Sequence, residues 1–106
     1  MNQNLLSQIF AMSAELIENC RHNGLTLATA ESCTGGNVAH KITSIAGSSA
    51  YYNGSIVTYS NEEKIDKLGV EKKTIENFGA VSQQCVEEMG KGIIKFIPSD
   101  FGVAIS

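Results

Sequence analysis

The sequence predicts an α/β fold with a largely parallel sheet. Short segments rich in apolar and β-branched residues alternate with segments of helical period, which is the pattern of strands joined by helices. The 106 residues allow one small domain, and a hydrophobic share of 42% is enough to form its core. We therefore expect a single domain over residues 1–106.

The chain is expected to open with a helix over about residues 5–20, where apolar residues recur with a helical period. His22-Asn23-Gly24 then supplies the residues that a left-handed C-cap favours. The next segment, 25–30, is short, apolar and β-branched, and it predicts the first strand.

A turn over residues 31–36 leads from this strand into a second helix, for which Ser32 or Thr34 is the expected N-cap. The apolar residues of that helix are Val38, Ile42 and Ile45. Residues 51–59 predict the second strand, with a bulge or interruption at Asn53-Gly54.

Three helices are expected after the second strand. The first covers residues 60–68, opened by a capping box and closed by Gly69. The second covers 72–78 and is also followed by a glycine, and Ser82 caps a longer third helix that stops before Pro98.

Residues 101–106 predict the last strand, and their apolar sequence is typical of a buried central strand. Nothing follows in the sequence to flank it, although exposed apolar edges pair with other chains. We therefore expect either a truncated domain or a homo-oligomer whose second protomer completes the sheet.

Composition narrows the function classes. The net charge of −3 argues mildly against a nucleic-acid partner, and no apolar segment approaches the length needed to cross a membrane. Cys20, Cys33 and Cys85 form no CxxC pair or zinc motif, so no metal site is expected and each cysteine is read as a small buried hydrophobe. This cysteine usage and the lack of a secretory signal predict a cytoplasmic protein.

The strongest chemical signal is the segment from Glu31 to Gly36, ESCTGG, between a strand and a helix. A serine at such a turn, here Ser32, presents its hydroxyl at the carboxyl end of the sheet, where α/β proteins usually bind ligands. Free N–H groups at the helix start can hold an oxyanion or a phosphate, and Gly35 and Gly36 permit close approach. Taken alone, the segment is more often an N-cap serine followed by packing glycines, because Ser and Thr are favoured caps.

A nucleophilic serine needs a base, and neither histidine is suitably placed: His22 falls at a helix end and His40 beyond the glycines. Lys64 falls in about the first turn of a helix that follows a strand, which places it at the same end of a parallel sheet as Ser32. The helix start also disfavours its positive charge. Tyr59 ends the strand and could pass a proton or orient Lys64, although a solvated lysine paired with a glutamate is the ordinary alternative.

Two further candidates are weaker. Cys33 is a possible nucleophile beside a helix start, but without a histidine partner a buried cysteine is favoured. Ser48 and Ser49 belong to a Ser/Gly-rich loop that could contact a ligand, and as a pattern they are an ordinary loop.

Three blocks of the sequence resemble the C-terminal domain of the CinA family of nicotinamide-nucleotide amidases. They are ATAESCTGG (28–36), AGSSAYYNGSIVTYSNEEKIDKLGV (46–70) and GAVSQQCVEEMGKG (79–92). The blocks occur in the family's order and near its spacing, so the resemblance covers most of the chain.

The resemblance implies a three-layer α/β/α fold with a mostly parallel, mixed sheet. It also implies hydrolysis of nicotinamide mononucleotide to nicotinate mononucleotide and ammonia, without a metal or other cofactor. By this match Ser32 is the nucleophile, Lys64 its base and Tyr59 a neighbour of the pair. The turn around the reacting group is formed by Thr34, Gly35 and Gly36.

The sequence departs from the family in two respects. Family members continue with a glycine- and proline-containing loop about where this chain reaches Ser106, so we expect roughly the last third of the domain to be missing. Asn37 also replaces a usually apolar residue. A second hypothesis follows: a catalytically incomplete remnant that binds a nucleotide or a partner chain.

Overall fold

A computed structural model describes residues 14–106 of the chain. Residues 14–23 are helical, whereas the earlier part of the predicted first helix lies outside the described residues. No helix within this range combines the length and apolar character that a bilayer crossing requires.

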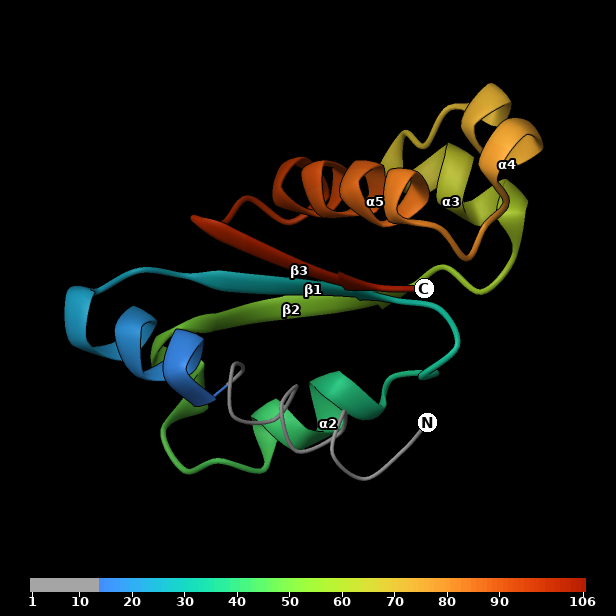
Figure 1. Cartoon of the computed structure of the whole chain (residues 1–106). Helices are drawn as coiled ribbons and strands as arrows, with labels where there is room; N and C mark the ends of the chain where they lie inside the picture. Colours follow the sequence, from blue (N-terminus) through green and yellow to red (C-terminus); the bar gives the residue numbers. More distant parts are fainter. Residues whose placement is uncertain (1–13) are drawn as a thin grey trace.

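A three-stranded parallel sheet forms the centre of the molecule (Figure 1). Its strands are β1 (Leu27–Glu31), β2 (Tyr52–Val57) and β3 (Phe101–Ile105), in the order β2-β1-β3. Every pairing among them is parallel, and β1 is buried along its whole length. The sequence therefore predicted the α/β class and the parallel sheet correctly, and the described sheet contains no antiparallel pair.

Helices cover both faces of the sheet, which makes three layers (Figure 1). One face carries α3 (Asn61–Leu68), α4 (Lys72–Phe78) and α5 (Gln83–Phe96). The other carries α2 (Asn37–Thr43) and the helix at 14–23, with the short 3-10 helix η1 (Ser48–Ala50) leading into β2.

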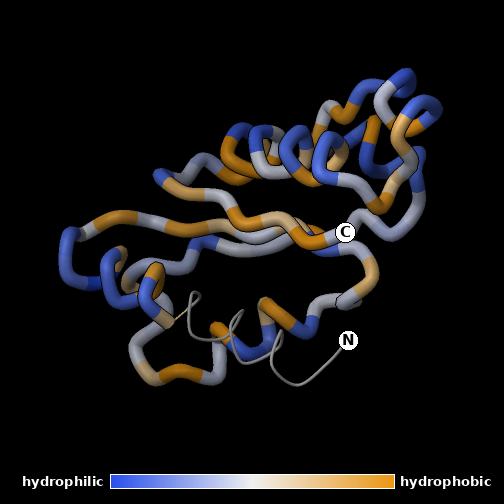
Figure 2. Tube along the Cα trace, in the orientation of Figure 1, coloured by the Kyte–Doolittle hydropathy of each residue, from blue (hydrophilic) through white to orange (hydrophobic). Residues whose placement is uncertain are grey.

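The two faces of β1 supply two hydrophobic cores, because successive side chains of a strand point to opposite faces. Ala28 and Ala30 pack with Met89 and Ile93 of α5. Leu27 packs on the other side with Ile42 of α2 and Tyr51. Figure 2 shows the resulting pattern, with apolar stretches along the strands and hydrophilic stretches on outer helix turns.

Local sequence signals predicted the helices α3 and α5 well. Ser60 caps α3 by accepting a hydrogen bond from the Glu63 amide at 3.2 Å, and Gly69 ends that helix in the left-handed conformation. Ser82 caps α5 in the same manner, through the Cys85 amide at 3.1 Å. These signals are contained within a few residues, so tertiary packing does not override them.

The strands required corrections. The first strand is Leu27–Glu31 rather than 25–30, while the bulge expected at Asn53-Gly54 is present, since Leu27 pairs with Tyr52 and Ala28 with Gly54. The strand expected at 101–106 is present as β3, and within residues 14–106 it pairs only with β1. β3 therefore lies at the edge of the described sheet and is mostly half-buried.

Candidate active site

Ser32 and Lys64 form a buried polar pair at the carboxyl end of the sheet. The Lys64 Nζ atom lies 3.1 Å from Ser32 Oγ, and the side chains are 2% and 8% exposed respectively. Lys64 Nζ also donates to the main-chain oxygens of Thr58, at 3.1 Å, and Tyr59, at 3.3 Å. The structure therefore brings together two residues that the sequence placed at one end of the sheet.

The parallel sheet explains why these residues meet. Ser32 follows the last residue of β1, and Lys64 lies in the first turn of α3, which follows β2. Because β1 and β2 are parallel neighbours, their carboxyl ends share one edge. A helical side chain leans toward the start of its helix, which brings Lys64 back over that edge.

The acceptors around Lys64 match the donors of an amine. An ammonium group has three N–H bonds, one for each of the three oxygens. In the neutral form, two N–H bonds can serve the carbonyl oxygens, and the lone pair can then accept a hydrogen bond from the hydroxyl of Ser32. No carboxylate forms an ion pair with Lys64 within residues 14–106. The arrangement can therefore accept a proton from Ser32 without first breaking a salt bridge.

The turn after Ser32 presents unused main-chain donors. Gly35 and Gly36 have φ values of 59° and 101°, a region that favours glycine. Within the part of the chain that the structure describes, the amides of Cys33, Thr34 and Gly36 have no acceptor. Such groups can stabilise an oxyanion that forms beside Ser32.

The start of α2 differs from the prediction. Gly36, rather than Ser32 or Thr34, is its N-cap residue and makes no side-chain cap bond. The amides of Val38 and Ala39 are instead occupied by the carboxylate of Glu31, at 2.9 and 3.0 Å. The expectation that these helix-start amides are free to bind a ligand was therefore wrong. Glu31 was not predicted as a site residue, because its only signal in the sequence is an acidic side chain at the end of a buried strand.

The remaining predicted site residues lie farther away or face solvent. The Tyr59 side chain is 74% exposed, and this residue contacts Lys64 through its carbonyl oxygen. Ser48 and Ser49 belong to η1, before the amino end of β2, whereas Ser32 follows the carboxyl end of β1. The structure therefore does not bring these two serines to the Ser32–Lys64 pair.

The cysteines divide into one exposed and two buried thiols. Cys33 is exposed, so its predicted burial was wrong, while Cys20 and Cys85 are buried as expected. Desolvation by burial raises the pKa of Cys20, and Asp100 adds to the effect. Burial also raises the pKa of Cys85, although the nearby positive charge of Lys64 acts in the opposite direction. His22 and His40 are both exposed.

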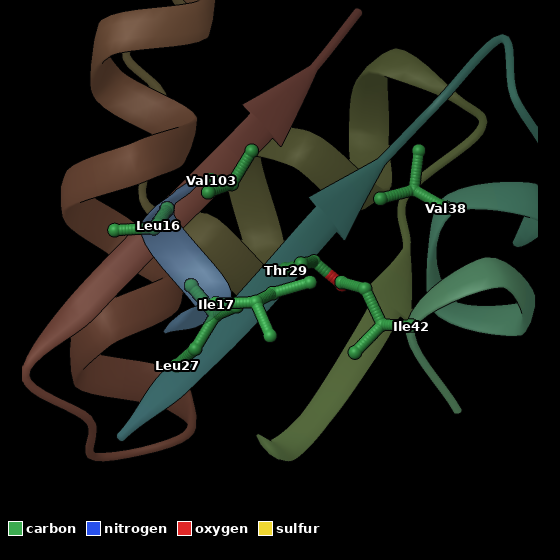
Figure 3. A pocket seen from close by; sticks show the side chains of 7 residues that line it. All are labelled: Leu16, Ile17, Leu27, Thr29, Val38, Ile42 and Val103. Atoms are coloured by element: carbon green, nitrogen blue, oxygen red, sulfur yellow. The ribbon is translucent and has the colours of Figure 1, made fainter. Parts of the chain in front are cut away.

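The cavity on the α2 side of the sheet is not the site of this chemistry. Figure 3 shows its lining, which includes Ile17, Ile42 and Val103, with Thr29 as the single polar residue. The Thr29 hydroxyl is already paired with that of Tyr52 at 2.6 Å. A cavity volume of about 10 Å³ has room for little more than one water molecule. Within residues 14–106, no three His, Cys, Asp or Glu side chains are grouped so as to hold a metal ion.

Known proteins are similar to this chain in sequence. The nicotinamide-nucleotide amidohydrolase PncC of Escherichia coli (strain K12) is 45% identical over 100 residues, which cover 94% of this chain and 61% of that protein. A CinA-like protein of Endomicrobium trichonymphae is 51% identical over 84 residues, which cover 79% of this chain and 20% of that protein. The chain therefore spans only part of each relative's length.

Solved structures agree with these sequence matches. The crystal structure of the competence damage-inducible protein A (ComA) from Klebsiella pneumoniae subsp. pneumoniae MGH 78578 superposes with a TM-score of 0.83 at 38% identity. The match covers 91% of this chain and 60% of that one. The family model described as the CinA C-terminal domain matches residues 9–106. The chain therefore belongs to the CinA C-terminal domain family.

Proposed function

We propose that the chain carries the catalytic pair of an amidohydrolase that converts nicotinamide mononucleotide to nicotinate mononucleotide and ammonia. The observation that carries this proposal is the buried 3.1 Å contact between Lys64 Nζ and Ser32 Oγ. The substrate is suggested by the 45% identity to a protein named nicotinamide-nucleotide amidohydrolase, of which the chain covers 61%.

The first half of the reaction forms an acyl-enzyme. Neutral Lys64 takes the hydroxyl proton of Ser32, and Oγ attacks the carboxamide carbon of the substrate. The carbonyl π electrons move to oxygen, where the free amides of Cys33, Thr34 and Gly36 stabilise the negative charge. Lys64 then donates its proton to the departing nitrogen. The C–N bond breaks, ammonia leaves, and the acyl group remains on Ser32.

The second half releases the acid. Lys64, neutral again, takes a proton from a water molecule that attacks the acyl carbon. The bond to Ser32 Oγ breaks, and the proton held by Lys64 returns to that oxygen. The products are a carboxylic acid, which ionises, and the regenerated pair.

Other predicted residues have smaller roles in this mechanism. The Tyr59 carbonyl orients Lys64 through its 3.3 Å hydrogen bond. Gly35 and Gly36 give the turn a backbone that few other residues adopt. Ser48 and Ser49 lie at the opposite end of the sheet, so the mechanism assigns them no contact within one protomer.

Ammonia release from nicotinamide mononucleotide tests the proposal. Ser32→Ala and Lys64→Met should each lower turnover by about a thousandfold or more, because a unit of nucleophile and base fails when either part is lost. Lys67→Met removes an exposed lysine of the same helix and should retain turnover. Full turnover by folded Ser32→Ala would refute the assignment of the nucleophile.

The exposed edge of the sheet favours a second candidate function, in which the chain binds a nucleotide or a partner chain without turnover. Among the described strands β3 pairs only with β1, and Phe101 at its start is 40% exposed. A free edge of this kind can pair with a second copy, so a homo-oligomer is part of this proposal. Thermal stabilisation by nicotinamide mononucleotide without ammonia release would support the binding function, and multiple turnover would exclude it.

A cytoplasmic location is also proposed. Cys20, Cys33 and Cys85 are all free thiols, the state that a reducing compartment maintains. Fractionation of cells that express the protein with an epitope tag tests this location, and recovery in a secreted or periplasmic fraction would contradict it.

A further inference from the structure

Glu31 is a fully buried carboxylate that the mechanism above does not use. Its Oε1 atom accepts hydrogen bonds from Thr34 Oγ1 at 2.6 Å and the Val38 amide at 2.9 Å, and its Oε2 atom accepts one from the Ala39 amide at 3.0 Å. Burial of an unpaired charge is costly, and no cation forms an ion pair with Glu31 within residues 14–106. Its negative charge is therefore balanced by three donors and by the positive end of α2.

Glu31 and Ser32 are adjacent in the sequence, and their side chains contact helices on opposite faces of the sheet. Their side chains point to opposite faces of the sheet, so Glu31 meets the start of α2 while Ser32 meets Lys64 of α3. The main chain at this position is also held on both sides. The Glu31 carbonyl accepts from the Thr58 amide at 2.9 Å, and the Ser32 amide donates to the Ile105 carbonyl at 3.0 Å.

These bonds fix both ends of the turn that carries the unused amides. The sheet holds the turn at Ser32, and the Glu31 carboxylate holds it at Thr34 and at the first residues of α2. A helix cap alone could be provided by a side chain at position 36, but Gly36 has none. The cap is instead the carboxylate of Glu31, the residue before Ser32. The start of α2 is therefore linked to the position of Ser32.

We propose that Glu31 is a positioning residue for the Ser32 nucleophile and for the amides that receive the developing oxyanion. This inference rests on the proposed role of Ser32. By occupying the Val38 and Ala39 amides, the carboxylate also leaves Cys33, Thr34 and Gly36 as the donors available to the reacting oxygen. Loss of the carboxylate bonds releases the turn, so that these donors and Oγ lose their fixed separation.

A fluorophosphonate probe tests the inference without relying on the natural substrate. Attack by Ser32 Oγ on phosphorus displaces fluoride, and the phosphoryl oxygen takes the place of an oxyanion. Glu31→Gln keeps the shape of the side chain but replaces one acceptor oxygen with a donor that faces an N–H group. We expect it to slow labelling of Ser32 on the order of tenfold. The matched control, Glu87→Gln, changes an exposed glutamate of α5 and should label at the rate of the unaltered protein.

A second pair of variants keeps the test decisive if Glu31→Gln does not fold. Thr34→Val removes the hydroxyl that donates to Glu31 and keeps the main-chain amide, whereas Thr34→Ser keeps both. Labelling of Ser32 should be several-fold slower in the valine variant than in the serine variant. Circular dichroism and the unfolding temperature establish that the compared proteins are folded. Equal labelling rates in folded valine and serine variants would overturn the role of the Glu31–Thr34 bond.

The outcomes separate this inference from the proposed reaction. Slow labelling by folded Glu31→Gln supports the positioning role, even if the unaltered protein releases no ammonia from nicotinamide mononucleotide. In ammonia release, the same variant should show a lower kcat with little change in KM. Labelling of folded Glu31→Gln at the unaltered rate overturns the positioning role and leaves the proposed reaction standing. Labelling of the unaltered protein at a residue other than Ser32 overturns both.

Discussion

The Lys64 Nζ atom lies 3.1 Å from Ser32 Oγ although the two residues are 32 positions apart in the sequence. Both side chains are buried, so the contact is neither a flexible surface pair nor screened by water. The sheet creates the contact, because β1 and β2 run parallel and deliver the following residues to one edge. We propose that this pair is a nucleophile and its base.

Lys64→Met should remove activity without a comparable loss of stability. Methionine has a similar length and is apolar, so it can fill the same buried space without leaving a cavity. Two carbonyl oxygens, those of Thr58 and Tyr59, lose a donor, so we expect a net change within about 2 kcal/mol. Urea unfolding at pH 7 measures it. A loss of more than about 4 kcal/mol would show that the lysine is retained for the fold instead.

Two glycines of α5 should respond to alanine in opposite directions. A Cβ atom at Gly92 would lie 1.9 Å from the main-chain oxygen of Leu68, so α5 must move away from α3, the helix that carries Lys64. We expect Gly92→Ala to destabilise the protein by about 2 kcal/mol or more.

Gly90→Ala is the matched control. Its Cβ atom would meet only the Cβ atom of Ala104, at 4.0 Å, so the higher helix propensity of alanine should stabilise the protein by roughly 0.5–1 kcal/mol. Thermal unfolding compares the two variants, and equal effects would contradict the close packing of α5 on α3.

One thiol of the three should react rapidly in the folded protein. Cys33 is exposed, whereas Cys20 and Cys85 are buried and burial raises the pKa of both. Ellman's reagent should therefore modify Cys33 in a fast phase and the other two only after unfolding. Cys33→Ala should eliminate the fast phase and retain amidase turnover. Loss of turnover in that variant would instead favour a cysteine nucleophile.

Glu88 should stabilise the protein at neutral pH and lose this effect in acid. Its carboxylate accepts a hydrogen bond from the Glu71 amide at 2.8 Å, and this bond, with a smaller contribution from Thr74, lowers the pKa of Glu88. Because the pKa is lower in the folded protein, the stabilisation is complete above the ordinary glutamate value of about 4.3 and is lost as pH falls below it.

Urea unfolding of Glu88→Gln tests this pH dependence of the stability. At pH 7 the variant should be less stable by about 1 kcal/mol, and the difference should shrink as pH falls from about 4.3 to 3. The neighbouring exposed residue provides a control, since Glu87→Gln should show no such convergence. A difference that is constant from pH 7 to pH 3 would exclude the carboxylate as its source.

The helices of one layer were predictable because their signals are local. Ser60 and Ser82 cap helices through amides three residues later, and Gly69 ends a helix at its own position. The approach of Lys64 to Ser32 was also predictable, because it depends only on the order of elements in a parallel sheet.

Other features depend on contacts that no short pattern records. β3 has the apolar sequence of a central strand, but among the described strands it pairs only with β1 and is mostly half-buried, which its own residues do not reveal. Ser48 and Ser49 lie in η1, before the amino end of β2, and the pattern of a Ser/Gly-rich loop does not say whether it contacts a ligand. Glu31 was missed because its hydrogen-bond donors are the amides of Val38 and Ala39 in α2. The capping rules placed the start of that helix at a different residue.

Trapping the acyl-enzyme during turnover of nicotinamide mononucleotide tests whether Ser32 is the nucleophile. Acid quench followed by peptide mapping locates the covalent adduct, whose mass should equal that of the substrate minus ammonia. We predict this adduct on Ser32, and its absence in Ser32→Ala. Steady ammonia release with an adduct on another residue, or with no adduct in an experiment that detects a known acyl-enzyme, would contradict it.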